Sequence, residues 1–279
     1  EQLKFTRLVR KHLDKFPNAH LFYGAGVATA EDHTDYAVAI LNDGTRVECD
    51  WLIGCDGANS MVRQSFGFEF PGETFAERFL VMSTTYEFRD VMTDLVEVAY
   101  ITDPDEWMVL LKTPDHWRCL MAVSPDEDDD VAVTDERIQE RLNSVLADLG
   151  HEHVDFPLVG KSLYRVNQRV AKNFAINRIL LAGDSAHMNN PLGGFGMNSG
   201  IHDAWSAGDV VEAVELRGAD AHKAAQIHGV VRSEVCHSYV QANTKKNFKD
   251  MQEKDEAARQ ARNAMLRALQ DDVEAQKEY

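Results

Sequence analysis

The sequence predicts a mixed α/β fold: an α/β domain with a parallel sheet, an antiparallel sheet inserted into that domain, and helices at the C-terminal end. Three observations predict it. Apolar runs that stop at Asp-Gly or Gly-Asp, in residues 51–57 and 179–184, are typical of buried parallel strands. Short β-rich runs separated by turns fill residues 70–164. Residues 219–279 are rich in alternating charges and predict solvated helices.

These patterns divide the chain. We expect the α/β domain to comprise residues 1–69 and 165–218, the inserted sheet to comprise residues 70–164, and the C-terminal helical segment to comprise residues 219–279. A chain of this length can bury one large core or two modest ones, so one or two domains are expected.

The first domain is expected to open with a helix and a hairpin. In residues 1–16, apolar residues recur at helical spacing with Lys and Arg between them. Alternating runs at 36–41 and 45–53 flank a turn at Asp43-Gly44, which is a strong hairpin signal. The second run leads into Asp56-Gly57, after which a short helix is expected.

The inserted region is expected to be an antiparallel sheet with one helix. Its strands are predicted at 79–86, 95–101, 107–111 and 117–123. Residues 134–149 have the spacing of an amphipathic helix, capped by Thr134. The acidic residues 127–130 predict a solvated turn rather than a metal site, because adjacent carboxylates do not converge on one ion without a dedicated loop. His151 and His153 lack a third ligand nearby, so we expect them in an exposed loop.

Residues 178–214 are the stretch around which the chain is organised. A short apolar strand ends at Gly183-Asp184 and places a carboxylate at its C-terminal end, where α/β sheets bind ligands. The glycine-rich loop 191–196 lets backbone approach a flat ligand closely. The helix that starts near Gly196 points its N-terminus at this loop and favours negative charge there. A carboxylate for hydroxyl groups, a flat loop and a helix dipole together suit a flavin.

Apolar residues of this helix recur at helical spacing, and we expect the face that they form to be buried. They are Met197, Ile201, Ala204, Trp205, Gly208, Val211 and Val214.

The same stretch resembles the second flavin-binding motif of the FAD-dependent aromatic hydroxylases of the p-hydroxybenzoate hydroxylase type, the group A flavoprotein monooxygenases. The matching residues are Asp184, His187, Pro191, Gly194, Gly196, Asn198, Gly200, Asp203 and Ala204. The resemblance implies that Asp184 binds the ribityl chain and that Pro191, the catalytic position, lies against the ring near the reacting carbon. It also implies that the loop and helix start hold the pyrimidine edge of the ring, through Gly193, Gly194, Gly196, Met197 and Asn198.

A second motif supports this resemblance. Asp56 and Gly57, followed by Ser60 and Arg63, are similar to the Asp-Gly motif of the same family. The resemblance places Asp56, Gly57 and Arg63 near the FAD pyrophosphate and implicates them in the use of NAD(P)H. Two motifs in the family's order are far more specific than either one alone.

One family motif is missing. The family's FAD domain starts with a strand, a Gly-x-Gly-x-x-Gly turn and a helix. Gly24-Ala25-Gly26 has neither the third glycine nor the helix, so we interpret it as a turn. We therefore expect this N-terminal dinucleotide unit to be absent and the chain alone to be an incomplete, inactive part of a larger enzyme.

The resemblance implies a monooxygenase that hydroxylates a small aromatic, phenolic substrate. In the family, NAD(P)H reduces FAD, O₂ adds to the reduced ring as a C4a-hydroperoxide, and one oxygen atom is transferred. Substrate contacts are sought among Tyr86, Tyr100, Trp107 and Trp117, each of which is also a candidate for the core. No residue identifies itself as the substrate-activating base. His187 is either a cofactor contact or a structural histidine.

Composition and net charge limit the kinds of partner that we expect for this protein. The 279 residues are 44% hydrophobic and 27% charged, as in ordinary soluble globular proteins. The net charge of −17 argues against nucleic acid and anionic membranes. No apolar run is long enough to span a membrane. Four scattered cysteines suit reduced thiols and a cytoplasmic protein, with no metal expected. A homodimer is left open.

Three alternatives stay open. The first is another flavoprotein of the same fold, an epoxidase or a reductase. The second is a serine hydrolase of the Gly-Asp-Ser type with Ser185 as nucleophile, although an acid, a nucleophile and a base so close in sequence do not form a relay. The third is an inactive fragment that binds no flavin.

Overall fold

The computed structural model describes residues 2–103, 106–148, 150–270 and 272–278. The chain divides into two compact units. The first unit contains Glu1–Thr74 and Asn167–Thr244, and the second contains Phe75–Val166 and Lys245–Tyr279. The C-terminal helices are thus shared between the two units. The predicted mixture of α/β and antiparallel structure is confirmed.

The N-terminal part of the first unit is a helix followed by a small antiparallel sheet. Helix α1 spans Gln2–Leu13, and none of its described residues is buried. Strands β1 (Val27–Asp32), β2 (Ala37–Leu41) and β3 (Arg46–Cys49) pair in this order. The strand expected over residues 45–53 is divided, because the chain leaves this sheet after Cys49 and enters a second one as β4 (Leu52–Gly54).

The second sheet of this unit contains the parallel pair that the sequence predicts. Strand β11 (Ile179–Leu181) pairs parallel with β4 and antiparallel with β10 (Ala175–Ile176). Ile179, Leu180 and Leu181 are fully buried, which explains their continuous apolar run. Helix α2 (Met61–Ser65) follows β4.

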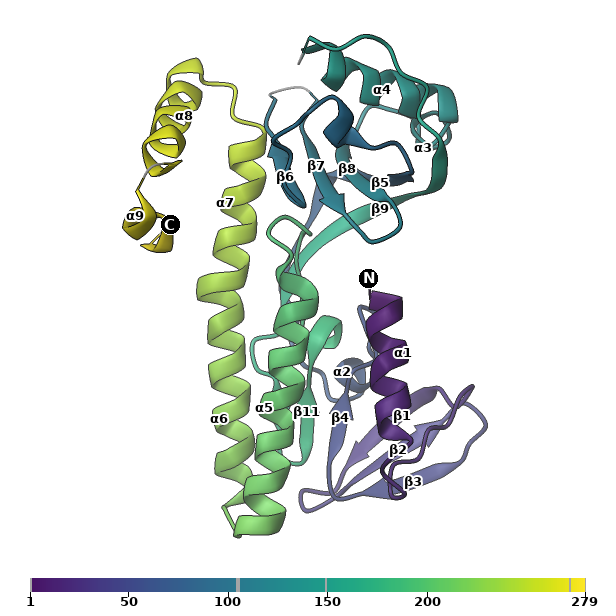
Figure 1. Cartoon of the computed structure of the whole chain (residues 1–279). Helices are drawn as coiled ribbons and strands as arrows, with labels where there is room; N and C mark the ends of the chain where they lie inside the picture. The colour runs from purple at the N-terminus through teal and green to yellow at the C-terminus, as the bar shows by residue number, and fades with distance from the viewer. Residues whose placement is uncertain (1, 104–105, 149, 271, 279) are drawn as a thin grey trace. The chain divides into compact units, whose positions relative to one another are not determined.

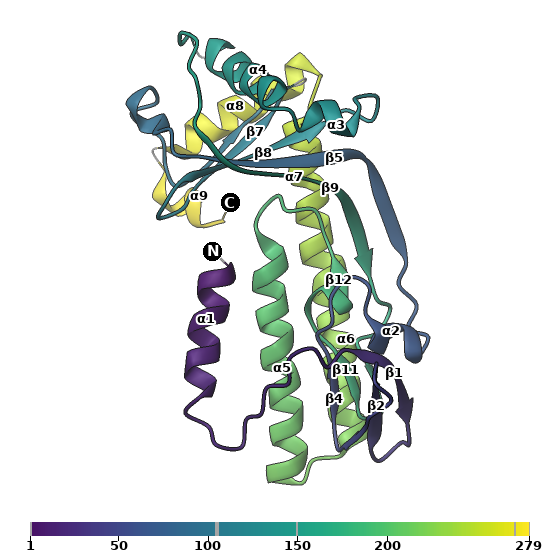
Figure 2. The same ribbon diagram turned by 90° about the vertical axis from the view of Figure 1, so that its right-hand side faces the viewer.

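Two long helices pack beside this sheet. Helices α5 (Phe195–Arg217) and α6 (Ala221–Val235) lie side by side in both views of the chain (Figures 1 and 2). Helix α6 continues through a π-helical segment, Cys236–Gln241, into α7 (Ala242–Met251). Gly229 of α6 lies against Asn173 and Ala175, so the helix backbone approaches the sheet closely.

The face of α5 that is buried differs from the predicted one. Its apolar residues Met197, Ile201 and Trp205 are exposed, Trp205 by 74%. The buried residues are instead Ser199, Asp203, Ala207 and Val210. The prediction was wrong because a buried carboxylate with ionic partners, rather than the apolar stripe, faces the rest of the unit.

The second unit is built on an antiparallel sheet. Strands β5 (Gly72–Thr84), β8 (Trp117–Val123), β7 (Met108–Lys112) and β6 (Val98–Ile101) lie in this order, and β9 (Leu158–Val170) flanks β5. Within the first unit, the end of β9 pairs with β12 (His187–Met188). The predicted antiparallel arrangement is confirmed.

One face of this sheet packs against helices. Helix α4 (Asp135–Asp148) follows the short α3 (Asp129–Ala132), and Thr134 accepts a hydrogen bond from the Arg137 amide as the predicted cap. Leu149, the last residue of the predicted helix, lies outside the described residues. The core between sheet and helix includes Leu80, Met82, Phe88, Met108, Trp117, Met121, Ile138 and Leu142.

The chain ends in α8 (Glu256–Gln270) and α9 (Val273–Glu278), as the charge pattern of the C-terminal segment predicts. Among the described residues, no helix combines the length and the apolar character that crossing a membrane requires.

Candidate flavin site

Two strand ends bring the predicted motifs together. Because β4 and β11 are parallel neighbours, with Gly54 beside Leu181, the residues that follow them leave the same edge of the sheet. Asp56 follows β4, and Asp184 follows β11. The Ala182 amide donates to the Gly54 carbonyl at 3.0 Å and continues the pairing up to this edge.

Asp184 lies in a tight turn immediately beyond the strand. Gly183 has φ +64°, which favours glycine, and Gly183–Ser185 form one turn of 3₁₀ helix. The Asp184 side chain is exposed, and no hydrogen bond to another described residue holds its carboxylate. It is therefore an acceptor available to hydroxyl groups of a ligand.

The glycine-rich loop forms a surface with few side chains at the start of α5. Gly194 caps the helix in the left-handed conformation and has no side chain to bond the first helical amides. A Cβ at Gly196 would meet no atom within 4 Å, so open space lies beside the backbone. Such a helix start offers N–H donors and a favourable dipole to an electron-rich ring. The residues therefore fit the edge of a flavin.

The other residues predicted for this loop lie at or near its surface. Pro191 is half-buried, and its carbonyl accepts from the Gly194 amide at 3.0 Å. Asn198 is exposed and donates through Nδ2 to the Gly194 carbonyl at 3.0 Å. Met197 is also exposed. Contact of these residues and of Gly193 with a flavin stays a prediction.

The Asp-Gly loop is organised by the start of α2. Asp56 is exposed and accepts from the Val62 amide at 3.1 Å, and Ser60 caps the helix by accepting from the Arg63 amide at 2.9 Å. Because β4 and β11 are neighbours, Asp56 and Gly57 leave the same sheet edge as the Asp184 turn, where the sequence predicts a ligand. Their contact with a cofactor is untested.

Arg63 joins the two motifs from inside the protein. Its side chain is only 7% exposed, and its two Nη atoms donate to the carbonyls of Ser185 (2.9 Å) and Ala58 (2.7 Å). The guanidinium also lies 4.0 Å from the centre of the Phe70 ring. Burial lowers the pKa of Arg63. With its donors engaged in this way, Arg63 supports both loops, and direct cofactor contact by Arg63 stays a prediction.

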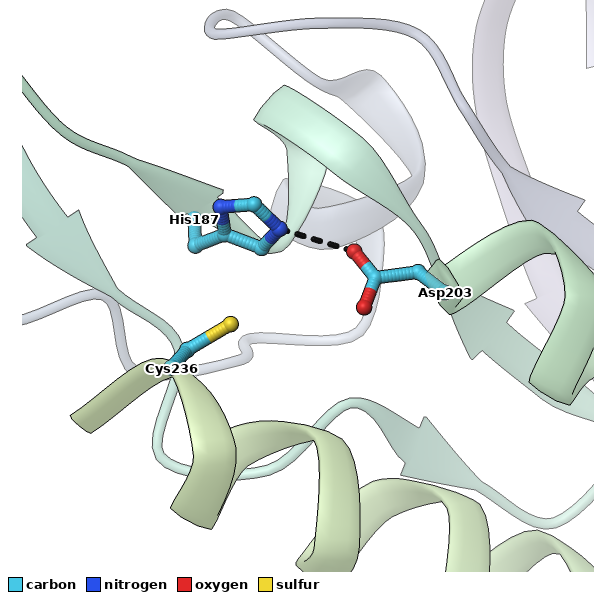
Figure 3. A group of neighbouring side chains, drawn as sticks. All are labelled: His187, Asp203 and Cys236. Carbon is cyan, nitrogen blue, oxygen red and sulfur yellow. Dashed lines mark hydrogen bonds and ion pairs between the residues drawn. The ribbon is translucent and has the colours of Figure 1, made fainter. Parts of the chain in front are cut away.

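His187 lies beneath the site in a buried cluster with Asp203 and Cys236 (Figure 3). Its Nε2 is 2.7 Å from Oδ2 of Asp203. Burial alone would lower the pKa of His187, but the hydrogen bond and charge of Asp203, together with the neighbouring Cys236, outweigh it and raise the pKa to about 10. The sequence left two roles open for His187, a cofactor contact and a structural histidine. This geometry supports the structural role.

Asp203 matches the family motif in the sequence, but the sequence assigned it no role. It is fully buried and receives hydrogen bonds from three residues: the Gly183 amide (3.0 Å), His187 (2.7 Å) and Nε of Arg232 (2.7 Å). Burial would raise the pKa of Asp203, but the bond from His187 and the other donors hold it below its usual value. A sequence signal existed: Ser199, Asp203 and Ala207 are spaced by four along α5.

The cluster of His187, Asp203 and Cys236 contains the ligand types that zinc prefers. However, both carboxylate oxygens of Asp203 already accept hydrogen bonds, one of them from the cationic Arg232. A guanidinium beside the carboxylate opposes a second cation there. We therefore interpret the cluster as a hydrogen-bonded ion-pair group.

The serine hydrolase alternative is wrong. Ser185 is fully buried, and its hydroxyl lies 2.5 Å from the Gly54 carbonyl and 2.8 Å from the Ala182 carbonyl. His187 is bonded to Asp203. A nucleophile must reach its substrate and its base, and Ser185 is placed to do neither.

Of the aromatic residues considered for substrate contact, most are core residues. Tyr86 and Trp117 pack in the core between the sheet and α4. Trp107 is 2% exposed and packs edge-on against Phe79. Tyr100 is 42% exposed and lies on the other face of the sheet. The pairing of β6, β7 and β8 places Arg118, which sequence analysis did not consider, on that same face.

A parallel strand pair ending in two acidic loops, with a glycine-rich loop at a helix start, defines a flavin-binding α/β protein with an inserted antiparallel sheet. The FAD binding domain family matches residues 1–267, and the chain belongs to this family. Members typically use NAD(P)H as co-substrate.

Relatives and solved structures agree with this assignment. The chain is 29% identical over 266 residues to para-nitrophenol 4-monooxygenase of Pseudomonas sp. (strain WBC-3), covering 94% of this chain and 65% of the relative. It is 30% identical to the 3-(3-hydroxy-phenyl)propionate/3-hydroxycinnamic acid hydroxylase of Klebsiella pneumoniae, covering 70% of this chain and 34% of that protein. The chain therefore spans less than two thirds of the length of these curated relatives.

The crystal structure of p-nitrophenol 4-monooxygenase PnpA from Pseudomonas putida DLL-E4 superposes with a TM-score of 0.89 at 29% identity, covering 99% of this chain and 70% of that one. Klebsiella pneumoniae HpxO, solved with FAD and uric acid, is 18% identical with a TM-score of 0.71 and shows the fold alone.

Proposed function

We propose that this chain supplies the flavin-ring site and the substrate sheet of an NAD(P)H-dependent FAD monooxygenase that hydroxylates a small phenolic compound with O₂. The observation that carries the proposal is the meeting of three features where the parallel strands β4 and β11 end: the Asp184 turn, the Asp56-Gly57 loop and the start of α5, which has no side-chain cap. Membership of the FAD binding domain family supports it.

We assign a function to each of the predicted segments. Residues 1–69 and 165–218 bind FAD, and residues 70–164 bind the substrate. A cytoplasmic location and assembly as a homodimer are further parts of the proposal, the location resting on the scattered cysteines.

Each residue of the site has a role that its geometry permits. FAD, when bound, supplies the chemistry by accepting a hydride from NAD(P)H and activating O₂. Asp184 accepts hydrogen bonds from ribityl hydroxyls, because its carboxylate is exposed. The first amides of α5 and the loop before it donate to the ring's pyrimidine edge and stabilise negative charge there. Pro191 and Met197 pack against the ring. Asp56 and Gly57 lie towards the pyrophosphate.

The names of relatives and the second unit support the proposed substrate class. The names of the relatives describe enzymes acting on para-nitrophenol, on a hydroxypyridine and on a hydroxyphenyl propionate, so a hydroxyl group on an aromatic ring is common to them. The sheet face with Tyr100 and Arg118 offers an aromatic surface and a cation for such a ring and its oxygen.

FAD binding by the whole chain tests this proposal, and the binding is measured through the quenching of flavin fluorescence. We expect saturable binding, and we expect Asp184→Ala to weaken it by about tenfold, since a hydrogen bond to a charged group contributes about 1.5–3 kcal/mol. Asp209→Ala is the matched control, because Asp209 is an exposed aspartate of α5 beyond the loop. Equal affinity of Asp184→Ala and wild type would remove Asp184 from the site, and absence of binding by wild type would contradict the proposed function.

A further inference from the structure

Asp203 connects the two halves of the flavin site from beneath. It belongs to α5, whose N-terminal end carries the glycine-rich loop, and it binds the segment that carries Asp184. We propose that Asp203 is a positioning residue that sets the spacing between the Asp184 turn and the start of α5. This inference rests on the proposed function, because that spacing decides how a flavin fits between the ribityl acceptor and the helix N-terminus.

The hydrogen bonds of Asp203 draw the two halves together. Its Oδ2 accepts from the Gly183 amide at 3.0 Å and from His187 at 2.7 Å, so two points of the segment around Asp184 are held by one oxygen. Gly183 is the residue directly before Asp184. A movement of α5 would therefore carry Asp203 with it and displace the backbone at Asp184.

Two glycines limit how closely the halves approach. A Cβ added at Gly200 would lie 3.3 Å from the Cα of Gly183, which is tighter than ordinary van der Waals contact. Gly200 lies one helical turn before Asp203, on the side of the flavin loop. The carboxylate therefore pulls the strand end towards the helix, and the glycine contact sets the closest distance.

A third element fixes Asp203 itself. Arg232 of α6 donates to Oδ1 at 2.7 Å and also to the Ser199 carbonyl of α5 at 3.4 Å. The carboxylate is fully buried between this cation and His187. In such surroundings the negative charge matters, because a neutral amide of the same shape has one acceptor oxygen and would leave at least one of these donors facing its NH₂ group.

The first test compares Asp203→Asn with Asp209→Asn in the whole chain. We expect Asp203→Asn to weaken FAD binding by about tenfold or more and to change the shape of the bound flavin's visible absorbance band. Hydrogen exchange of peptides covering residues 183–187, measured without FAD, should become faster. Asp209→Asn should match wild type in all three measurements. Faster exchange with unchanged FAD affinity and spectrum would overturn the proposal and leave Asp203 a structural residue.

A second pair of variants tests the spacing without altering any charge. Gly200→Ala should force α5 away from Gly183 and weaken FAD binding, while all donors to Asp203 remain. Gly208→Ala is the matched control in the same helix, because a Cβ there meets no atom within 4 Å. Equal FAD affinities for the two alanine variants would contradict the proposal, and this pair decides the question if Asp203→Asn does not fold. If wild type binds no FAD, the proposed function fails, whereas the exchange measurement still reports whether Asp203 holds Gly183.

Discussion

Among the described residues, each unit has a buried ion-pair group, one around Asp203 and one around Arg141, and the two groups differ in what they hold. In the first unit, Asp203 binds Arg232, His187 and the backbone amide directly before Asp184. In the second unit, Arg141 is 3% exposed and binds Glu106 and Glu127 as well as the Ala122 carbonyl. The first group reaches into the candidate site, whereas the second ties α4 to its own sheet. Burial of charge alone therefore does not identify a functional residue.

Removing the centre of the second group should produce the largest loss of stability. Arg141→Met leaves Glu106 and Glu127 without their buried partner, and we expect a loss of about 3–5 kcal/mol in the free energy of unfolding. Arg137→Met is the control, since Arg137 binds the same two glutamates but is 31% exposed, and it should cost much less. Urea denaturation measures both. FAD affinity of folded Arg141→Met should equal that of wild type, and a weaker affinity would break the comparison.

The stability that the first group contributes should depend on pH through His187. The pKa of His187 is raised from 6.5 to about 10, so the folded state holds this proton more tightly than the unfolded chain does. Its stabilising contribution is complete below about pH 6.5 and is lost as the pH rises towards about 10. Urea midpoints should therefore fall over this range in wild type, and the fall should be smaller in His187→Gln. Identical slopes for the two proteins would contradict the ion pair.

The smallest effect is expected from Glu106→Gln. Burial raises the pKa of Glu106 despite the opposing charges of Arg141 and Arg137, so its ionised form is only partly compensated. Arg141 keeps Glu127 as a partner in this variant. We expect a change in unfolding free energy of about 1 kcal/mol or less, measured by urea denaturation. A loss as large as that of Arg141→Met would show that the second group depends on Glu106.

Local patterns of the sequence predicted the parts of the fold and site that depend on neighbouring residues. The strand ends at Asp56 and Asp184, the glycine-rich loop before α5 and the cap at Thr134 are each determined within a few positions of the chain. The split of the run 45–53 was not predictable in this way, because β4 pairs with β11, which lies more than a hundred positions later in the sequence.

The buried side chains of the site could not be predicted from local patterns. Asp203 is buried because His187 and Arg232 reach it from other segments, and Arg63 is engaged by the Ser185 carbonyl far along the chain. The core position of Trp117 depends on which face of the sheet α4 covers, and alternation along a strand does not reveal that.

Mapping FAD contacts by backbone amide NMR tests most directly whether the flavin ring binds where the parallel strands β4 and β11 end. On addition of FAD to the isotopically labelled whole chain, we predict shifts concentrated at Asp56-Gly57, at Gly183-Asp184 and at residues 193–198. Amides of α8 should remain unchanged. Shifts confined to other surfaces, or none at saturating FAD, would contradict the account.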